Sequence, residues 1–402
     1  MSYLIFCSFE VGGFPFRMAQ TLNRLGVETY YVYLGKMEKG HDSTQFHYGN
    51  REEPWYLSSR FEQAYNHSTE IIHRLRQLKS EYHITHCLAT GTEAYHLKQA
   101  GIRYHYWSFG SDLDYKCFIQ TGFKNHWMLL RFIRHPFRVY AERERARDSI
   151  RESDSVMISP YQIKAFRKIF SDKNIFFLPH CLKIIDDTVL FQQKEVNKRL
   201  ICKEIQADRY FFSSTRHCWA GYWKRMPDYK GNEVILHSYA KYLSFVNQDH
   251  SKLVLVKKGP DVEATRNLSK RLGIENRIIW VDEMKRGELD KYYQGADLCF
   301  GHFGTPVLTH AVLEALMNGT ISISFSKKRE AGLLFYNEDP PFLNSKSPKE
   351  IAEFMVDILN DQAGFEKRSY QSWLWVKENC SEKKFVESFL DLFKNFSNNI
   401  PL

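Results

Sequence analysis

Two cationic residues in the second half of the chain stand between predicted strands and helices. Arg216 closes the β-rich run "YFFSSTR", and Lys230 comes fourteen residues later, directly before Gly231 and a helical pattern. Arginine can form planar bidentate bonds to phosphate oxygens, and lysine supplies a compact positive charge. The pair therefore suits a diphosphate, although either residue alone is typical of a solvated surface cation.

The stretch "HFGTPVLTHAVLEALMNGT" at 302–320 places one acidic residue in an otherwise apolar helical pattern. Thr305 can cap the helix and Pro306 suits its first position, so we predict a helix over 306–318. Glu314 then lies on the flank of the apolar stripe. It is either a solvated helix residue or a carboxylate that reaches sugar hydroxyls beside a phosphate at the helix N-terminus.

The elements that position these residues alternate between strands and helices. Short β-branched or aromatic runs are separated by helical patterns in the first third, and a second such series begins near residue 208. This alternation predicts parallel strands with crossover helices. Regular periodicity fades after "LPHCLKIIDDT", so we place a domain junction near 183–205.

We therefore expect an α/β fold with two Rossmann-like domains facing across a cleft. The predicted boundaries are 1–185 for the first domain, 186–364 for the second, and 365–402 for terminal helices that could cross back to the first. Ligands of open α/β sheets lie beyond the carboxyl ends of strands, which is where Arg216 and Glu314 are expected.

Gly12 and Gly13 follow the first predicted strand and precede an amphipathic helix. Glycines at this place let a ligand approach backbone amides at a helix N-terminus. The stretch is not a GxGxxG fingerprint, because Phe16 stands where the third glycine is required. An ordinary turn is an equal alternative.

The second half resembles the donor-binding half of GT-B glycosyltransferases of family four, which are retaining enzymes that use nucleotide sugars. The resemblance spans roughly 209–326 and rests on Arg216, Lys230–Gly231, "KLVLVKKGPD", "RIIWVDEM", "YYQGADLCFGHFG" and "LEALMNGTISISF". It implies that the two cations hold the donor diphosphate and that Glu314 accepts hydrogen bonds from the ribose. Backbone amides near Leu308 and Thr309 would assist.

Two segments of the first half are similar to the same family. "EVGGFPF" resembles its acceptor-side glycine loop, which contains Gly12 and Gly13 here, and "WSFGSDL" resembles its His-Gly-x-Asp segment. The resemblance implies that Asp112 faces the acceptor. Phe109 stands where the family has histidine, so the chain departs from the pattern at this position.

A second departure concerns the opening of the predicted helix. The family carries another glutamate eight residues before the one matched by Glu314, and this chain has Pro306 there. His302, Thr305 or His310 could substitute in donor binding, but none restores the negative charge.

Metal-binding patterns are weak. Asp112 and Asp114 form an Asp-x-Asp pair, but hard cations need several further oxygen ligands. Histidines such as His86 and His105 lack the spacing of a zinc site. We therefore expect no metal and no resident cofactor, with the nucleotide sugar as co-substrate.

A basic and aromatic segment at 123–151 is typical of an interfacial helix on anionic lipid. Glu142, Glu144 and Asp148 offer ion-pair partners within it, so a charged helix packed on its own domain is an equal alternative. No zinc finger or RNP motif accompanies the charge, and we therefore expect no nucleic-acid partner.

Composition sets the remaining bounds. Lys and Arg number 56 against 47 Asp and Glu, and the formal charge of +9 favours anionic partners. The eight cysteines are scattered, without CxxC pairs, as in a reducing cytoplasm. Neither a signal peptide nor a membrane span is predicted. We expect a cytoplasmic protein that can bind peripherally to the inner face of the membrane.

The resemblance and these observations together favour a hexosyltransferase that moves a sugar from a nucleotide sugar to a hydroxyl of a lipid-linked surface glycan, in polysaccharide biosynthesis. Metal independence and retention at the anomeric carbon are implied by the resemblance. Arg216, Lys230 and the helix N-terminus would stabilise charge on the leaving diphosphate. Two alternatives stay open: a GT-B isomerase or epimerase of nucleotide sugars, and a non-catalytic protein that binds sugar nucleotides or glycans.

Overall fold

The computed structural model forms two compact units, one of residues 1–181 together with 382–402 and one of residues 182–381. Each unit is built on a six-stranded sheet of parallel strand pairs. The predicted α/β class with two Rossmann-like sheets is thus confirmed. The structure describes residues 2–8, 14–34, 53–61, 67–108, 134–159, 162–225, 229–246, 249–304, 306–326, 336 and 338–397.

In the first unit the strand order is β2-β1-β3-β4-β5-β6. Its strands form at the β-branched and aromatic runs of the sequence, and their side chains are mostly buried, as in other parallel sheets. The strands are β1 (Ser2–Cys7), β2 (Thr29–Tyr33), β3 (Ile84–Thr90), β4 (Arg103–Trp107), β5 (Ser155–Met157) and β6 (Asn174–Ile175). The helices are α1 (Phe14–Arg24), α3 (Ser68–Glu81), α4 (Tyr95–Gln99), α6 (Pro136–Arg151), α7 (Ile163–Arg167) and α16 (Glu382–Ser397), with a 3-10 turn η1 (Ser58–Phe61).

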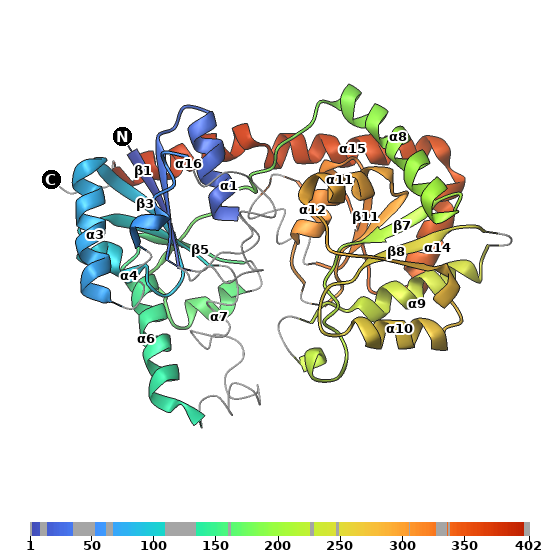
Figure 1. Cartoon of the computed structure of the whole chain (residues 1–402), viewed down its shortest axis with the longest axis horizontal. Coiled ribbons are helices and arrows are strands. Elements are labelled where there is room, and N and C mark those ends of the chain that lie inside the picture. The colour runs from blue at the N-terminus through green and yellow to red at the C-terminus, as the bar shows by residue number, and fades with distance from the viewer. Residues whose placement is uncertain are drawn as a thin grey trace. The chain divides into compact units, whose positions relative to one another are not determined.

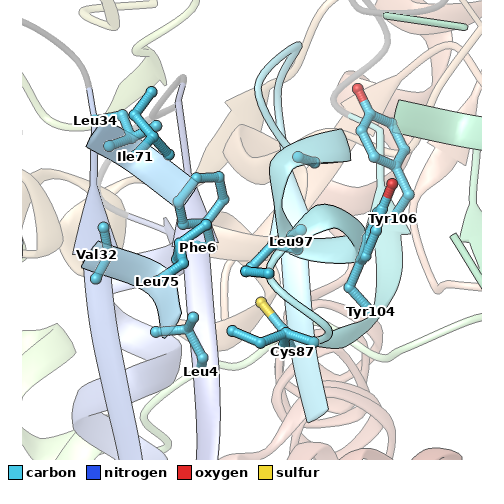
Figure 2. Close-up of a cluster of buried hydrophobic side chains, with 14 of the residues drawn as sticks. Leu4, Phe6, Val32, Leu34, Ile71, Leu75, Cys87, Leu97, Tyr104 and Tyr106 are labelled. Carbon is cyan, nitrogen blue, oxygen red and sulfur yellow. The ribbon is translucent and has the colours of Figure 1, made fainter. Parts of the chain in front are cut away.

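Helices α3, α4, α6 and α7 contribute to the core on one face of this sheet. Phe6 and Val32 of the strands pack with Leu75 of α3 and Leu97 of α4 in one buried cluster (Figure 2). Burying each such side chain contributes about 1.5–3 kcal/mol. This cluster fixes the strands of the first unit.

The last helix of the chain, α16, packs on the first unit. The ring of Phe393 lies 5.3 Å from that of His86 and 4.8 Å from that of His105, both edge-on. Thr21 Oγ1 of α1 donates to Glu382 Oε1 at 3.0 Å. The terminal segment is therefore divided, with α16 in the first unit and the preceding helix in the second.

In the second unit the strand order is β12-β11-β10-β7-β8-β9. Helices α8, α11 and α12 lie on one side of the sheet, and α9, α10 and α14 lie on the other (Figure 1). The strands are β7 (Tyr210–Ser213), β8 (Lys252–Val256), β9 (Ile278–Val281), β10 (Leu298–Phe300), β11 (Ile321–Ser324) and β12 (Leu343–Asn344). The helices are α8 (Asp187–Ile205), α9 (Asn232–Leu243), α10 (Val262–Arg271), α11 (Arg286–Gly295), α12 (His310–Met317), α14 (Pro348–Asn360) and α15 (Gln362–Cys380), with 3-10 turns η5 (Gly221–Arg225) and η6 (Glu275–Arg277).

The sequence predicts a domain junction near 183–205 because the periodicity fades there, and the structure fills most of this stretch with α8, a helix of 19 residues. Asp186 caps this helix, because its Oδ1 accepts from Thr188 N at 3.1 Å. Its buried face includes a charged residue, Lys194, whose Nζ donates to Gln294 O at 3.1 Å and Thr320 Oγ1 at 3.0 Å. A lysine at a core position hides the apolar period on which the sequence prediction relied.

The start of α12 also differs from the prediction over 306–318. The helix begins at His310, and Thr309 occupies the N-cap position with φ −100° and ψ 159°. Because the backbone is extended at Thr309, the helix begins four residues later than expected. Pro306 therefore lies in the loop that precedes it. Thr305, the expected cap, lies outside the described residues.

Candidate functional site

The loops that follow β7, β8 and β10 meet at one edge of the second sheet. These three strands are neighbours in the order β10-β7-β8, and all are parallel, so their carboxyl ends share an edge. The loops are 214–219, 257–261 and 301–304. This edge is where ligands of open α/β sheets lie.

Arg216 is exposed at this edge, and the loop after β8 fixes its backbone. His217 N donates to Lys258 O at 2.7 Å. Gly259 has φ +106°, and a Cβ there would lie 2.6 Å from Arg216 Cγ, so glycine permits this approach. Burial lowers the pKa of His217 to about 4. His217 is therefore neutral at pH 7, and Arg216 carries positive charge in this loop.

The backbone of Lys230 joins the loops after β7 and β10. Lys230 N donates to Cys218 O at 2.8 Å, and Lys230 O accepts from Phe303 N at 2.8 Å. A side chain at Gly304 would overlap Tyr229 O, so the two segments can approach this closely only with glycine. The structure thus places Lys230 between the loop of Arg216 and the turn that begins the predicted donor stretch.

Sequence reasoning missed two side chains that hold these loops. Asn232, the first residue of α9, accepts from Cys218 N and donates to Thr215 O, both at 3.4 Å. Asp261 Oδ2 accepts from the next two backbone amides after Cys218, at 2.6 and 2.9 Å. Both residues stand at helix starts, but each binds the amides of this loop instead of capping its own helix. A polar residue at a predicted helix start is the signal that could have found them.

His302 lies in the turn after β10 and is 3% exposed. Neither of its ring nitrogens has a hydrogen-bond partner within the described part of the chain. Burial, together with the positive charges of Lys230 and Lys346, lowers the pKa of His302 to about 3. The ring is therefore neutral at pH 7, and one of its nitrogens carries a hydrogen.

Glu314 is engaged by neighbouring side chains and is only 15% exposed. Its Oε1 forms an ion pair with Arg286 Nη1, and its Oε2 accepts from Tyr293 Oη at 3.2 Å. Tyr293 Oη also shares a hydrogen bond of 2.6 Å with Ser214 Oγ. The interpretation of Glu314 as a solvated helix residue is therefore wrong. These contacts connect it to the loop that carries Arg216.

Arg286, which sequence reasoning missed, serves two carboxylates. Its Nη2 lies 2.8 Å from Asp290 Oδ1, one turn along α11, while its Nη1 meets Glu314. Asn318 Nδ2 donates to Asp290 Oδ1 at 3.3 Å. Burial raises the pKa of Asp290, and the attraction of Arg286 opposes that rise. One guanidinium therefore fixes the positions of both acidic side chains.

The other predicted donor residues lie just before α12. Leu308 and Thr309 directly precede its first residue, His310, and Thr309 Oγ1 is buried with no partner among the residues described. Amides at the start of a helix lack intrahelical partners, which makes the beginning of α12 a typical place for a ligand to bind. Thr305 is outside the described ranges.

The predicted acceptor-side residues also fall outside the described ranges. These are Gly12, Gly13 and Asp112, together with Phe109 at the family's histidine position. They stay predictions.

The basic segment is described from residue 134 onward, mostly as α6. Phe137 and Tyr140 are 89% and 58% exposed near its beginning. Further along the helix, basic residues pair within the first unit, as Arg145 does with Glu93 at 3.7 Å and Arg151 with Asp148 at 3.1 Å. The beginning of α6 thus presents exposed aromatic rings, whereas its later part is held by ion pairs.

Two features are absent from the residues that the structure describes. No helix among them is both long and apolar enough to cross a membrane. Within the same residues, no group of three or more His, Cys, Asp or Glu side chains has the arrangement of a metal site.

Comparison with known proteins adds a family match. Residues 219–372 match the model of glycosyl transferases group 1. This segment begins at the last residue of the loop of Arg216 and contains Lys230, His302 and Glu314. No curated protein matches the chain.

Solved structures similar to the chain have the GT-B fold. A glycosyltransferase from Rickettsia africae is 12% identical, with a TM-score of 0.63 and 99% of each chain covered. Anabaena HepE, crystallised with UDP, is 11% identical, with a TM-score of 0.61 and coverage of 98% of this chain and 100% of that one. Sucrose-phosphate synthase from Thermosynechococcus elongatus is 12% identical, with a TM-score of 0.61 and full coverage of both chains. At these identities the likeness shows the fold.

Proposed function

We propose that this chain, a glycosyltransferase of the GT-B fold whose residues 219–372 carry the group 1 domain, transfers a sugar from a nucleotide-sugar donor to a hydroxyl of a lipid-linked surface glycan. The observation that carries this proposal is the convergence of Arg216, Lys230 and the 301–304 turn at the carboxyl edge of one sheet. The UDP bound to the similar HepE structure supports a nucleoside diphosphate as part of the donor.

In the proposed reaction, the bond between the anomeric carbon and the diphosphate oxygen breaks, and the nucleoside diphosphate leaves with the electron pair. The acceptor hydroxyl forms the new bond and releases its proton. Arg216, Lys230 and the amides at the start of α12 stabilise the charge that develops on the leaving group. Preorganised charges of this kind are usually the largest contribution to catalysis. Retention at the anomeric carbon and independence of metal are proposed from the family resemblance.

Glu314 is proposed to bind the donor ribose. Its two oxygens already accept from Arg286 and Tyr293, which fixes the carboxylate rather than excluding a ligand. A carboxylate oxygen accepts about two hydrogen bonds, so about one position on each oxygen is left for vicinal hydroxyls. Leu308, Thr309, His302 and Thr305 are proposed to contact the same donor.

The acceptor is proposed to bind near Gly12, Gly13 and Asp112. We further propose that the protein works at the cytoplasmic face of a membrane, which the beginning of α6 contacts. Exposed aromatic rings at Phe137 and Tyr140 support this proposal, because such rings prefer the headgroup region of a bilayer.

A panel of nucleotide sugars in a thermal-shift assay tests the proposal. A donor that binds the folded protein raises its apparent stability by mass action, by about 2.7 kcal/mol at a hundred times its Kd. The stabilising donor is then incubated with and without a lipid-linked acceptor. Transfer to the acceptor is expected. Stabilisation without any transfer would favour a binding protein, a rearranged donor without acceptor would favour an isomerase, and no stabilisation by any nucleotide sugar would contradict the donor site itself.

A further inference from the structure

Lys346 stands at the same edge of the second sheet, two residues beyond the end of β12. Its neighbour Ser345 donates from its backbone N to Ser324 O at 3.2 Å, which continues the pairing of β12 with β11. Lys346 Nζ lies 4.0 Å from the centre of the Phe325 ring, which a cation favours. The exposed ammonium group is thus held at the carboxyl edge rather than left to move freely.

The ammonium of Lys346 points to the turn that contacts Lys230. Lys346 Nζ donates to Gly304 O at 3.4 Å, and the Cβ position of Gly304 is 3.0 Å from Lys230 N. The two lysines therefore flank one glycine. Among the residues that the structure describes, Lys346 forms no ion pair. Burial lowers the pKa of Lys346, and the attraction of Glu233 opposes this shift only in part.

A second, independent feature of this place is the buried ring of His302. It lies in the same turn, two residues before Gly304, and its nitrogens lack hydrogen-bond partners in the described part of the molecule. A buried polar group without a partner costs about 1–3 kcal/mol. A buried polar group of this kind needs an explanation, and a ligand that would bond to it is one.

We propose that Lys346 and His302 form an anion subsite beside Lys230, which takes an oxyanion of the donor: either a phosphate of its diphosphate or a carboxylate on its sugar. This inference rests on the proposed nucleotide-sugar function. It adds Lys346 to the donor site and assigns His302, already proposed to contact the donor, to one anionic group. An ammonium has three hydrogens, of which Gly304 O receives one over a long distance, so the others can reach ligand oxygens. A neutral His302 can donate one hydrogen bond to the same group.

Calorimetry on the full-length chain tests this subsite with inorganic pyrophosphate, UDP, GDP and ADP as ligands. Lys346→Met removes the charge from an exposed side chain and should leave the fold intact. We expect it to weaken the binding of pyrophosphate and of the preferred nucleoside diphosphate about tenfold. Lys346→Arg should retain most of the affinity. His302→Phe, which keeps a buried ring without nitrogens, should weaken binding in the same direction.

The matched control is Lys349→Met, three residues along the chain, because Lys349 is exposed and pairs with Glu353 at 3.7 Å. It should bind every ligand as the wild type does. If Lys346→Met changes only the affinity for a nucleotide uronic acid, compared with the neutral nucleotide hexose, the oxyanion is the sugar carboxylate. If it changes none of these affinities, the subsite is wrong. A wild-type protein that binds no nucleotide would instead contradict the proposed function.

Discussion

Replacing Glu314 by glutamine tests the ribose assignment, because the two oxygens of its carboxylate have separate partners. Arg286 binds Oε1 and Tyr293 Oη donates to Oε2. Glutamine keeps one oxygen and replaces the other by an amide group that only donates. Its oxygen should remain at Arg286, because a guanidinium has no acceptor for the amide hydrogens. The amide then faces Tyr293, on the side where one ribose hydroxyl would have donated to the carboxylate.

The expected loss follows from that geometry. One hydrogen bond to a charged acceptor is removed, which is worth about 1.5–3 kcal/mol. This corresponds to a Kd about 10 to 150 times higher for a ligand that contains the ribose. The free energy of unfolding should fall by only about 1 kcal/mol, because Asp290 still neutralises Arg286 after the change.

Calorimetry with two ligands separates the ribose from the phosphates. Glu314→Gln should weaken binding of the preferred nucleoside diphosphate and leave the affinity for inorganic pyrophosphate unchanged. Asp290→Asn is the matched control, since it removes the other carboxylate from the same guanidinium and should affect stability alone. Equal affinity of Glu314→Gln and wild type for the nucleoside diphosphate would refute the ribose role. An equal loss for both ligands would show that the substitution disturbs the diphosphate site instead.

Three further predictions concern other parts of the molecule. Arg216→Ala and Lys230→Ala should each weaken pyrophosphate binding about tenfold or more, and unchanged calorimetric affinity in both would end their assignment to the diphosphate. Burial lowers the pKa of Lys194 from 10.5 to about 8, so the unfolded chain binds more protons between these values and stability should rise with pH across them. Urea unfolding should show the free energy of unfolding of the wild type rising by up to about 3 kcal/mol over this pH range, whereas that of Lys194→Met should not rise. Parallel pH profiles of the two proteins would contradict this prediction. The double change of Phe137 and Tyr140 to alanine should reduce flotation with anionic liposomes, and recovery equal to wild type would reject docking through α6.

Much of the fold could be predicted, because each strand is a short β-branched or aromatic run between helical patterns. These local signals suffice for a parallel sheet, whose strands are buried on both faces. The helix α8 was missed for a physical reason that no local rule contains. Lys194 lies on its buried face, where Gln294 O and Thr320 Oγ1 from distant segments satisfy its ammonium group. From the sequence alone, a lysine at a core position cannot be told from a lysine at the surface, because its acceptors come from distant segments of the chain.

Helix boundaries were predicted less well for a similar reason. Two threonines, Thr305 and Thr309, can each cap the helix before Glu314, and local preference favours the first because Pro306 follows it. The structure has Thr309 at the N-cap position, although its side chain forms no capping bond. The shift moves the helix N-terminus four residues closer to Glu314, so the first amides of α12 and the carboxylate lie within about two turns of each other.

The surroundings of Glu314 show where sequence reasoning about the site reached its limit. Arg286 stands 28 positions earlier on α11, and no spacing rule connects it to a carboxylate on α12. The contact with Arg286 changes the alternatives for the role of Glu314. A solvated residue is excluded by the burial of Glu314, and the remaining contrast is between a structural ion pair and a carboxylate held ready for the ribose. A structural pair predicts that Glu314→Gln and Asp290→Asn act alike, since both remove one carboxylate from one guanidinium. A ribose-binding role predicts that they differ in nucleoside diphosphate affinity while resembling each other in stability.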